Sequence, residues 1–183
     1  MTRRTAPRLL LTAAVALSLA ACGGTDAGSS SAAGASTSAA SDCSAEAPTT
    51  AAPARVSTDL TERPKAPCWS APAPTELVLS DVVVGTGAEA VAGSATEVKY
   101  VGAFYESGEV FDASWDGGDD ETFPVTVGAG QVIDGFDQGI EGMEVGGRRV
   151  VTIPSDLGYG PAGQGPIPGG ATLVFVIDLV SVA

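Results

Sequence analysis

Short apolar runs broken by glycine fill the chain from residue 76 onward, and this pattern constrains its fold more than any other feature. Before Thr75 the apolar content is largely alanine, whereas valine, leucine, isoleucine and the aromatic residues concentrate after it. In the final run, 172–182, large apolar side chains occupy every second position: Leu173, Phe175, Ile177 and Leu179. This alternation indicates a strand that buries one face. The sequence therefore predicts a sheet of short strands whose last strand is half-buried.

One helix candidate interrupts the strands. Asp134 can cap an N-terminus, Phe136, Ile140 and Met143 follow at near-helical spacing, and Gly146-Gly147 ends the pattern. A helix this short is not stable alone in water, so we expect it to pack on the sheet. The predicted fold is α+β: a twisted antiparallel sheet of about five strands wrapped on one short helix, which lies against the concave face.

Residues 1–21 have the three regions of a secretory signal peptide. A start with three arginines precedes the apolar run 9–19, which is too short to span a bilayer because spanning needs about 20 apolar residues. The ending Leu-Ala-Ala-Cys resembles the bacterial lipobox, and this resemblance implies that the Cys22 thiol is lipidated and that Cys22 becomes the first mature residue. The alternative is an ordinary signal cut near Ala21, with Cys22 incidental.

Residues 22–74 are expected to form a tether and an arm rather than a domain. The segment 23–41 is almost wholly glycine, serine, alanine and threonine and cannot bury enough apolar area to fold. Proline disfavours helix in 42–73, and we expect this arm to pack against the edge of the following domain. Cys43 and Cys68 remain after Cys22, so an exported chain is expected to join them in a disulfide. Two free or intermolecular thiols are the alternative.

Charge and composition exclude several classes of function. The formal net charge is −13, and loss of the three signal arginines would leave six basic residues against 22 acidic ones, a charge of −16. Such a chain repels nucleic acid, so we expect no nucleic-acid partner. The absence of histidine removes the usual general base and the commonest metal ligand. The acidic run 116–121 lacks the EF-hand spacing, and we expect neither a metal site nor a cofactor.

Six sequence blocks resemble, in order, those of the FKBP-type peptidyl-prolyl cis-trans isomerases. The blocks are Val98–Gly102, Gly108–Ser114, Gly128–Phe136, Gly142–Gly146, Gly158–Gly160 and Ile167–Phe175. The resemblance covers 75–183 and does not extend to 1–74. It implies an isomerase domain that acts without a cofactor on proline-containing polypeptides and that binds macrolides of the rapamycin type.

The resemblance also implies which residues form the site. The implied catalytic groups are Asp112, the hydroxyl of Tyr159 and the backbone N–H of Ile133. The implied substrate-binding side chains are Tyr100, Phe111, Phe123, Val132, Phe136, Ile167 and Phe175. Phe136 matches a pocket-floor position where many members of the family have tryptophan. Without the order of the blocks, most of these side chains would be interpreted as ordinary core residues, and Asp112 as a turn cap.

Isomerisation of an X-Pro bond is compatible with a chain that has no histidine. Rotation about an X-Pro bond has a barrier of about 18–20 kcal/mol set by amide resonance, and lowering it requires no nucleophile. A dry aromatic pocket favours the less dipolar twisted amide. We therefore expect an isomerase that helps exported proteins to fold, anchored by lipid at the outer side of the cytoplasmic membrane. The alternative is a catalytically weak binding or chaperone module that kept the pocket.

Overall fold

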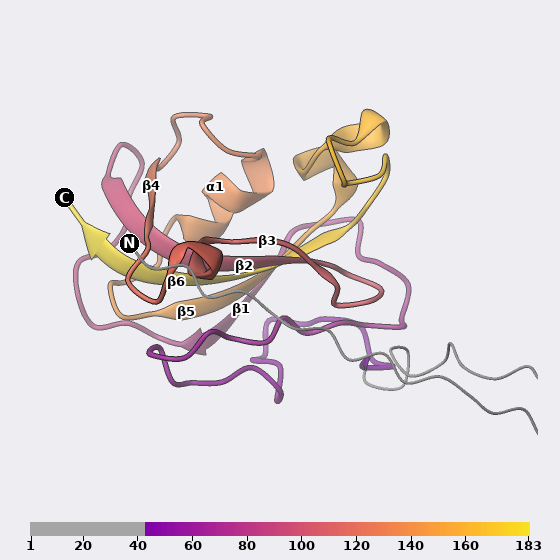
Figure 1. Cartoon of the computed structure of the whole chain (residues 1–183), viewed down its shortest axis with the longest axis horizontal. Helices are drawn as coiled ribbons and strands as arrows, with labels where there is room; N and C mark the ends of the chain where they lie inside the picture. The colour runs from indigo at the N-terminus through magenta and orange to yellow at the C-terminus, as the bar shows by residue number, and fades with distance from the viewer. Residues whose placement is uncertain (1–42) are drawn as a thin grey trace, which may run out of the picture. The chain divides into compact units, whose positions relative to one another are not determined.

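The computed structural model describes residues 43–183 (Figure 1). The expected signal peptide 1–21, the lipidation site Cys22 and the tether 23–41 lie outside the described residues. Within 43–183, no helix has the length and apolar character needed to cross a bilayer. The description that follows concerns this part of the chain alone.

A six-stranded antiparallel sheet forms the centre of the structure (Figure 1). Its strands are β1 (Val78–Val83), β2 (Ala95–Phe104), β3 (Val110–Ala113), β4 (Phe123–Thr126), β5 (Arg148–Ile153) and β6 (Leu173–Val182). The order is β1-β5-β6-β2-β3, and β4 also pairs with β2. The expected number of about five strands was therefore low by one. The long strand β2 has two short partners on the same side, because β4 pairs with 95–98 and β3 with 101–103.

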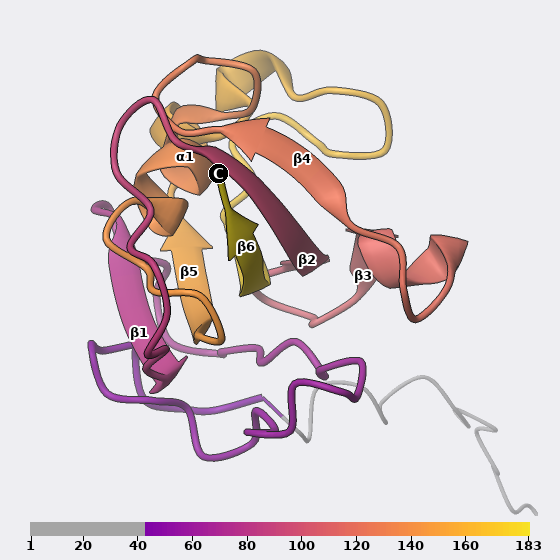
Figure 2. The ribbon, with the colours of Figure 1, turned by 90° about the vertical axis from the view of Figure 1, so that its left-hand side faces the viewer.

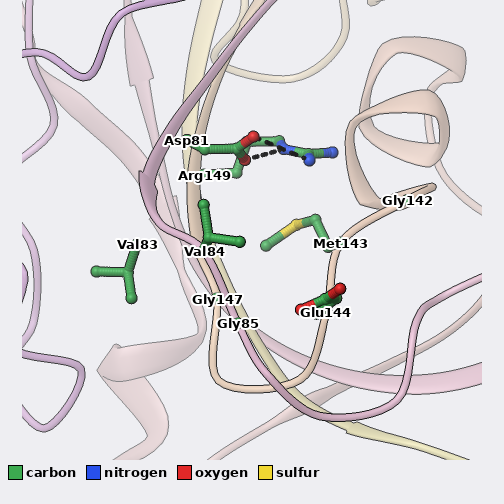
Figure 3. A pocket seen from close by; sticks show the side chains of 9 residues that line it. All are labelled: Asp81, Val83, Val84, Gly85, Gly142, Met143, Glu144, Gly147 and Arg149. Carbon is green, nitrogen blue, oxygen red and sulfur yellow. Dashed lines mark hydrogen bonds and ion pairs between the residues drawn. The ribbon is translucent and has the colours of Figure 1, made fainter.

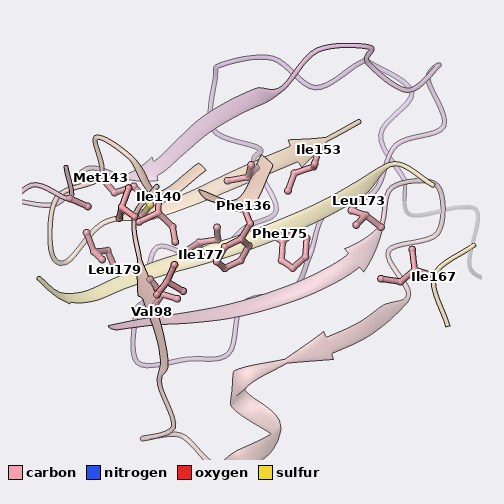
Figure 4. Packing of buried hydrophobic residues seen from close by; sticks show 14 residues of the cluster. Val98, Phe136, Ile140, Met143, Ile153, Ile167, Leu173, Phe175, Ile177 and Leu179 are labelled. Atoms are coloured by element: carbon pink, nitrogen blue, oxygen red, sulfur yellow. The ribbon is translucent and has the colours of Figure 1, made fainter. Parts of the chain in front are cut away.

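The helix α1 (Asp134–Ile140) packs on one face of the sheet, where Phe136 and Ile140 point toward Phe175 and Ile177 of β6 (Figure 4). The helix approaches β5 closely because it has glycine on the facing side. A Cβ on Gly135 would lie 2.4 Å from a methyl carbon of Ile153, a distance that real side chains do not reach. Burial against the sheet thus stabilises a helix that is too short to persist alone.

The ends of α1 differ from the expectation. Asp134 is the first helical residue rather than the cap, and the cap residue Ile133 has no side-chain hydrogen bond to the helix. Met143 lies beyond the last helical residue, Ile140, although it is buried in the same core. The spacing of apolar residues continued past the helix because the following turn also packs on the sheet.

The proline-rich arm, residues 43–74, covers a face of the sheet and not its edge. Val56, Ala66 and Trp69 are buried against β2, β5 and β6, on side chains such as Val101 and Val176. Figures 1 and 2 show α1 and the indigo arm on opposite sides of the sheet. Both faces are therefore covered, and β6 is buried from 173 to 179 instead of half-buried.

A disulfide joins Cys43 to Cys68 and holds the start of the arm beside the turn between β2 and β3. The backbone N–H of Trp69 donates to the carbonyl of Tyr105 at 3.0 Å. The rings of the two residues stack with their centroids 5.3 Å apart. The Cys68 side chain lies against Gly108, where an added Cβ would meet its Cβ at 3.3 Å. The bridge and the stacked rings thus fasten the arm to this turn.

Arg148 of β5 holds the middle of the arm. Its side chain is fully buried and donates twice to the Asp178 carboxylate on β6, at 2.5 and 2.6 Å. Its remaining N–H groups donate to the carbonyls of Ser57, Asp59 and Glu62, at 2.8, 3.0 and 3.1 Å. All five donors of the guanidinium are therefore paired, which is what a buried cation requires.

Arg149, the next residue on β5, points to the other face and holds the end of α1. It pairs with Asp81 of β1 at 2.6 Å, as Figure 3 shows, and it donates to the carbonyls of Gly139 and Glu141. These carbonyls belong to the last turn of the helix and to its cap, where the backbone leaves acceptors unpaired. Consecutive arginines on one strand thus fasten a different covering element to each face of the sheet.

Candidate active site

Five aromatic side chains from five different elements meet between α1 and the sheet. Phe136 of α1 and Phe175 of β6 are 3% and 5% exposed, and their ring centroids lie 5.1 Å apart in an edge-to-face contact. Tyr100 of β2 contacts both, at 5.7 and 6.1 Å. Phe111 of β3 contacts Phe175 at 5.7 Å, and Phe123 of β4 contacts Tyr100 at 5.6 Å. The buried pair forms a floor, and the other three rings surround it.

Gly102 allows two of these rings to come together over β2. An added Cβ would lie 2.8 Å from the Phe175 ring and 2.9 Å from the Phe111 ring. Any larger residue would therefore push the rings apart. This small residue in the middle of a strand is explained by the aromatic contacts it permits.

A polar pair lies at the side of the aromatic floor. The Tyr100 hydroxyl donates to the Asp112 carboxylate at 2.7 Å. Burial, followed by the hydrogen bond and charge of Asp112, raises the pKa of Tyr100 far above its usual value. The Ser114 hydroxyl also accepts the backbone N–H of Tyr100 at 3.0 Å. Tyr100 is therefore held in one orientation and stays protonated at neutral pH.

The expected donor Ile133 lies at the start of α1. It is half-buried, with an extended backbone, and its carbonyl accepts the N–H groups of Phe136 and Asp137 at 2.9 and 3.1 Å. Its own N–H has no acceptor within residues 43–183. The neighbouring Val132 is also half-buried against the aromatic floor. Ile133 thus offers a backbone donor beside an apolar surface.

Tyr159 and Ile167 come from the connection between β5 and β6. Ile167 is 7% exposed and packs in the same core as the floor. Tyr159 is half-buried, and its hydroxyl has no hydrogen-bond partner in the described part of the chain. Burial and then the charge of Asp112 raise the pKa of Tyr159, so Tyr159 also remains a neutral donor.

Two basic residues from elsewhere in the sequence contact the acidic loop 116–121. Arg63 of the arm pairs with Asp116 at 2.5 Å. Lys99 of β2 contacts the carbonyl of Asp119 and lies 4.6 Å from the Trp115 ring centroid. The loop has no basic residue that could pair with Asp112, and Tyr100 takes that position instead.

A protein-family model described as FKBP-type peptidyl-prolyl cis-trans isomerase matches residues 87–180, about half of the chain. The chain belongs to this family. It is 50% identical to a probable FK506-binding protein of Corynebacterium glutamicum over 120 residues, which cover 66% of this chain and 98% of that protein. An FK506-binding protein of Streptomyces anulatus is 47% identical over 123 residues, again 66% of this chain and 98% of that protein.

Among solved structures, the crystal structure of AtFKBP13 is similar, with a TM-score of 0.55 and 37% identity. The match covers 61% of this chain and 96% of that one. The expected FKBP-like fold, an antiparallel sheet with one helix, is thereby confirmed. The family model begins at residue 87, so the arm 43–74 lies outside that match.

The arrangement can perform the chemistry of the FKBP-type isomerases. The aromatic floor offers an apolar surface for a proline ring, and water exclusion there favours the twisted amide. The Ile133 N–H and the Tyr159 hydroxyl are donors without protein acceptors in the described chain, and they can hold substrate carbonyls. The Asp112 carboxylate orients Tyr100. The activity of the family therefore needs side chains and backbone alone.

The structure brings all ten expected site residues to one region, although they differ in depth. Phe136 and Phe175 of the floor are buried, as is Ile167 in the same core, whereas Asp112 and Phe123 are exposed at the margin. Sequence reasoning did not single out several supporting residues, namely Gly102, Phe104, Ser114 and Asp137. Gly102 and Ser114 end two of the family-like blocks, which was a usable signal. Phe104, which packs 5.2 Å from Phe111, and Asp137 had no such signal.

Proposed function

We propose that the protein is a lipid-anchored peptidyl-prolyl isomerase that acts on exported polypeptides at the outer side of the cytoplasmic membrane. Membership of the isomerase family supports the reaction. The observation that carries the proposal is the aromatic floor of Phe136 and Phe175 beside two unpaired donors, Ile133 N–H and the Tyr159 hydroxyl.

Two features support export and anchoring. Residues 1–22 have the pattern of a short export signal, and its ending Leu-Ala-Ala-Cys22 resembles the lipobox of lipoproteins. The Cys43–Cys68 disulfide suits an oxidising compartment outside the cytoplasm. A two-chain lipid on Cys22 would hold the domain at the membrane, because two acyl chains give stable binding. The tether between Cys22 and Cys43 would give the site access to polypeptides that leave the translocation machinery.

The substrates proposed are proline-containing segments that are still unfolded. Apolar residues before the proline should be preferred, because the floor and its surrounding rings are apolar. Macrolides of the rapamycin type should compete for the same surface, in agreement with the names of the relatives as FK506-binding proteins.

A protease-coupled assay on a short X-Pro peptide tests the reaction. A barrier lowered by about 5 kcal/mol would accelerate exchange several thousand-fold. Binding of the macrolide without turnover would favour the alternative, a binding or chaperone module. Failure of both, with a normal circular dichroism spectrum, would contradict the proposed site.

Metabolic labelling with a fatty acid tests the anchor. The unchanged protein should incorporate label and fractionate with membranes, whereas Cys22→Ala should do neither. Cys43→Ser is the matched control, because it removes a cysteine outside the signal and should leave labelling intact. Processed, unlabelled protein from the unchanged gene would refute the anchor but leave the isomerase proposal untouched.

A further inference from the structure

The loop between β4 and α1 is held by a buried carboxylate. This loop, residues 127–132, leads directly to Ile133, and it contains Gly128 and Gly130 at φ +76° and +66°. The Asp137 carboxylate, on a residue only 9% exposed, accepts the N–H of Gly128 at 2.7 Å and that of Gly130 at 3.3 Å. These amides turn inward because the glycines adopt left-handed conformations that other residues disfavour.

The charge of Asp137 has no cationic partner among the described residues. The ion pairs found there use Arg63, Arg148 and Arg149, each with a different acid. A buried carboxylate without a cation must be stabilised by hydrogen bonds, and here the donors are the two loop amides. The interaction therefore specifies the loop conformation, since any other conformation would leave a buried charge without donors.

Asp137 also contacts the other end of the loop. Its backbone N–H donates to the carbonyl of Ile133 at 3.1 Å. One helical residue thus fixes Gly128 and Gly130 by its side chain and Ile133 by its backbone. Between these points lies the peptide that carries the Ile133 N–H, the proposed donor to a substrate carbonyl.

We propose that Asp137 is a positioning residue for the isomerase reaction, which acts by aiming the Ile133 N–H at the substrate. The proposal rests on the proposed function of Ile133 as a donor. Asp137 is itself bonded to the loop and does not touch the substrate. Its effect reaches the reaction through the loop conformation, so loss of the carboxylate should weaken substrate binding and turnover while the sheet and its two coverings persist.

The first measurement uses the full chain, exported and processed, with Asp137→Asn. Asparagine keeps the shape but loses the charge that attracts two amides. Because one misaligned hydrogen bond lowers a rate constant about fivefold, kcat/KM for an X-Pro peptide should fall about five- to tenfold. Asp134→Asn is the matched control: it removes an exposed charge from the same helical turn and should change kcat/KM less than twofold. Asp137→Glu should recover part of the loss, since it restores the charge.

A double-variant cycle separates positioning from a general structural role. Ile133 has φ −62°, the value that proline adopts, so Ile133→Pro removes the donor without imposing a new backbone angle at that residue. In the Ile133→Pro background, Asp137→Asn should change kcat/KM less than twofold, because the group that it positions is already absent. Multiplicative losses in the double variant would overturn the proposal, as would an Asp137→Asn variant with unchanged kcat/KM.

Failure of the two proposals can be told apart. If the unchanged protein neither turns over the peptide nor binds a rapamycin-type macrolide, the proposed function fails. Amide hydrogen exchange then decides the role of Asp137: exchange at Gly128 and Gly130, whose amides donate to Asp137, should quicken about tenfold in Asp137→Asn while β6 remains protected. Unchanged exchange in the loop would overturn the assignment. If Asp137→Asn does not fold, Asp137→Ser, which also lacks the carboxylate, takes its place in both the cycle and the exchange measurement.

Discussion

Replacing Arg148 by methionine should destabilise the protein more than any surface charge change. The side chain is fully buried, and its five N–H groups join β5 to Asp178 of β6 and to three carbonyls of the arm. Methionine fills much of the same volume but leaves the Asp178 carboxylate, 6% exposed, without its partner. The arm loses its central attachment at the same time.

The expected loss is about 3–5 kcal/mol in the free energy of unfolding, the cost of leaving a buried charge unpaired. Total stabilities are about 5–15 kcal/mol, so this loss is a large fraction. The double variant Arg148→Met/Asp178→Leu should be more stable than Arg148→Met, because it removes the unpaired charge as well. The three arm carbonyls belong to residues that are half-buried or exposed, and water can replace their donors.

The loss should depend on pH with a definite sign. Burial raises the pKa of Asp178, and Arg148 opposes that shift. Without Arg148 the opposing effect disappears, so the folded-state pKa rises further above the unfolded value. A group of this kind contributes stability at low pH that is lost as pH rises through its folded pKa. Arg148→Met should therefore be more destabilised, relative to the unchanged protein, at pH 8 than at pH 5.

Urea unfolding followed by tryptophan fluorescence is a suitable assay. The chain has two tryptophans, Trp69 in the arm and Trp115, and both are buried on the face that the arm covers. The control is Arg63→Met, which breaks an exposed pair with Asp116 and should cost less than about 1 kcal/mol. A loss below about 1 kcal/mol for Arg148→Met, or a double variant less stable than this single one, would refute the reasoning.

Three further outcomes are expected. Replacing both Cys43 and Cys68 by serine should lower the unfolding free energy by about 3.5 kcal/mol, because the bridge closes a separation of 25 residues. Mass spectrometry that finds both cysteines alkylated in unreduced protein would contradict the bridge. Tyr159→Phe should reduce turnover about tenfold or less with unchanged urea stability, since it deletes one hydroxyl; full activity would remove Tyr159 from the mechanism. Turnover should be flat from about pH 6 to 9, because the raised pKa values of Tyr100 and Tyr159 keep both hydroxyls protonated. For the same reason the two tyrosines should reduce the free energy of unfolding only above about pH 10. A step in rate near pH 7 would reveal another titrating group.

The strands and the helix could be predicted because their side chains carry periodic patterns. Alternate large apolar residues in 172–182 identified β6, and the spacing of Phe136 and Ile140 identified α1. The degree of burial of β6 could not be predicted in this way, since the pattern reports one face only. Val174 and Val176 on the other face are buried by the arm, whose own apolar residues Val56, Ala66 and Trp69 have no regular spacing.

The site required a different kind of information. Period and propensity alone would have assigned Phe136 and Phe175 to the core, which is where they lie. The order of the family-like blocks marked both as pocket residues, with Phe136 at the pocket floor. Neither the periodic pattern nor the family-like blocks predicted the buried charged residues, because arginine and aspartate are ordinarily interpreted as solvent-exposed. Arg148, Asp178 and Asp137 became apparent only when the fold placed their partners around them.

The arm and the helix together explain how so small a domain supports an exposed aromatic site. A site that must admit a proline ring leaves part of the α1 face uncovered, with Tyr100, Phe111 and Phe123 only partly buried or exposed. The opposite face compensates for this missing burial, because the arm covers it with Trp69 and is fastened there by the disulfide and Arg148. The match to the family model covers residues 87–180 and therefore does not include this covering arm. Stability gained on the arm face thus allows the other face to remain open to substrate.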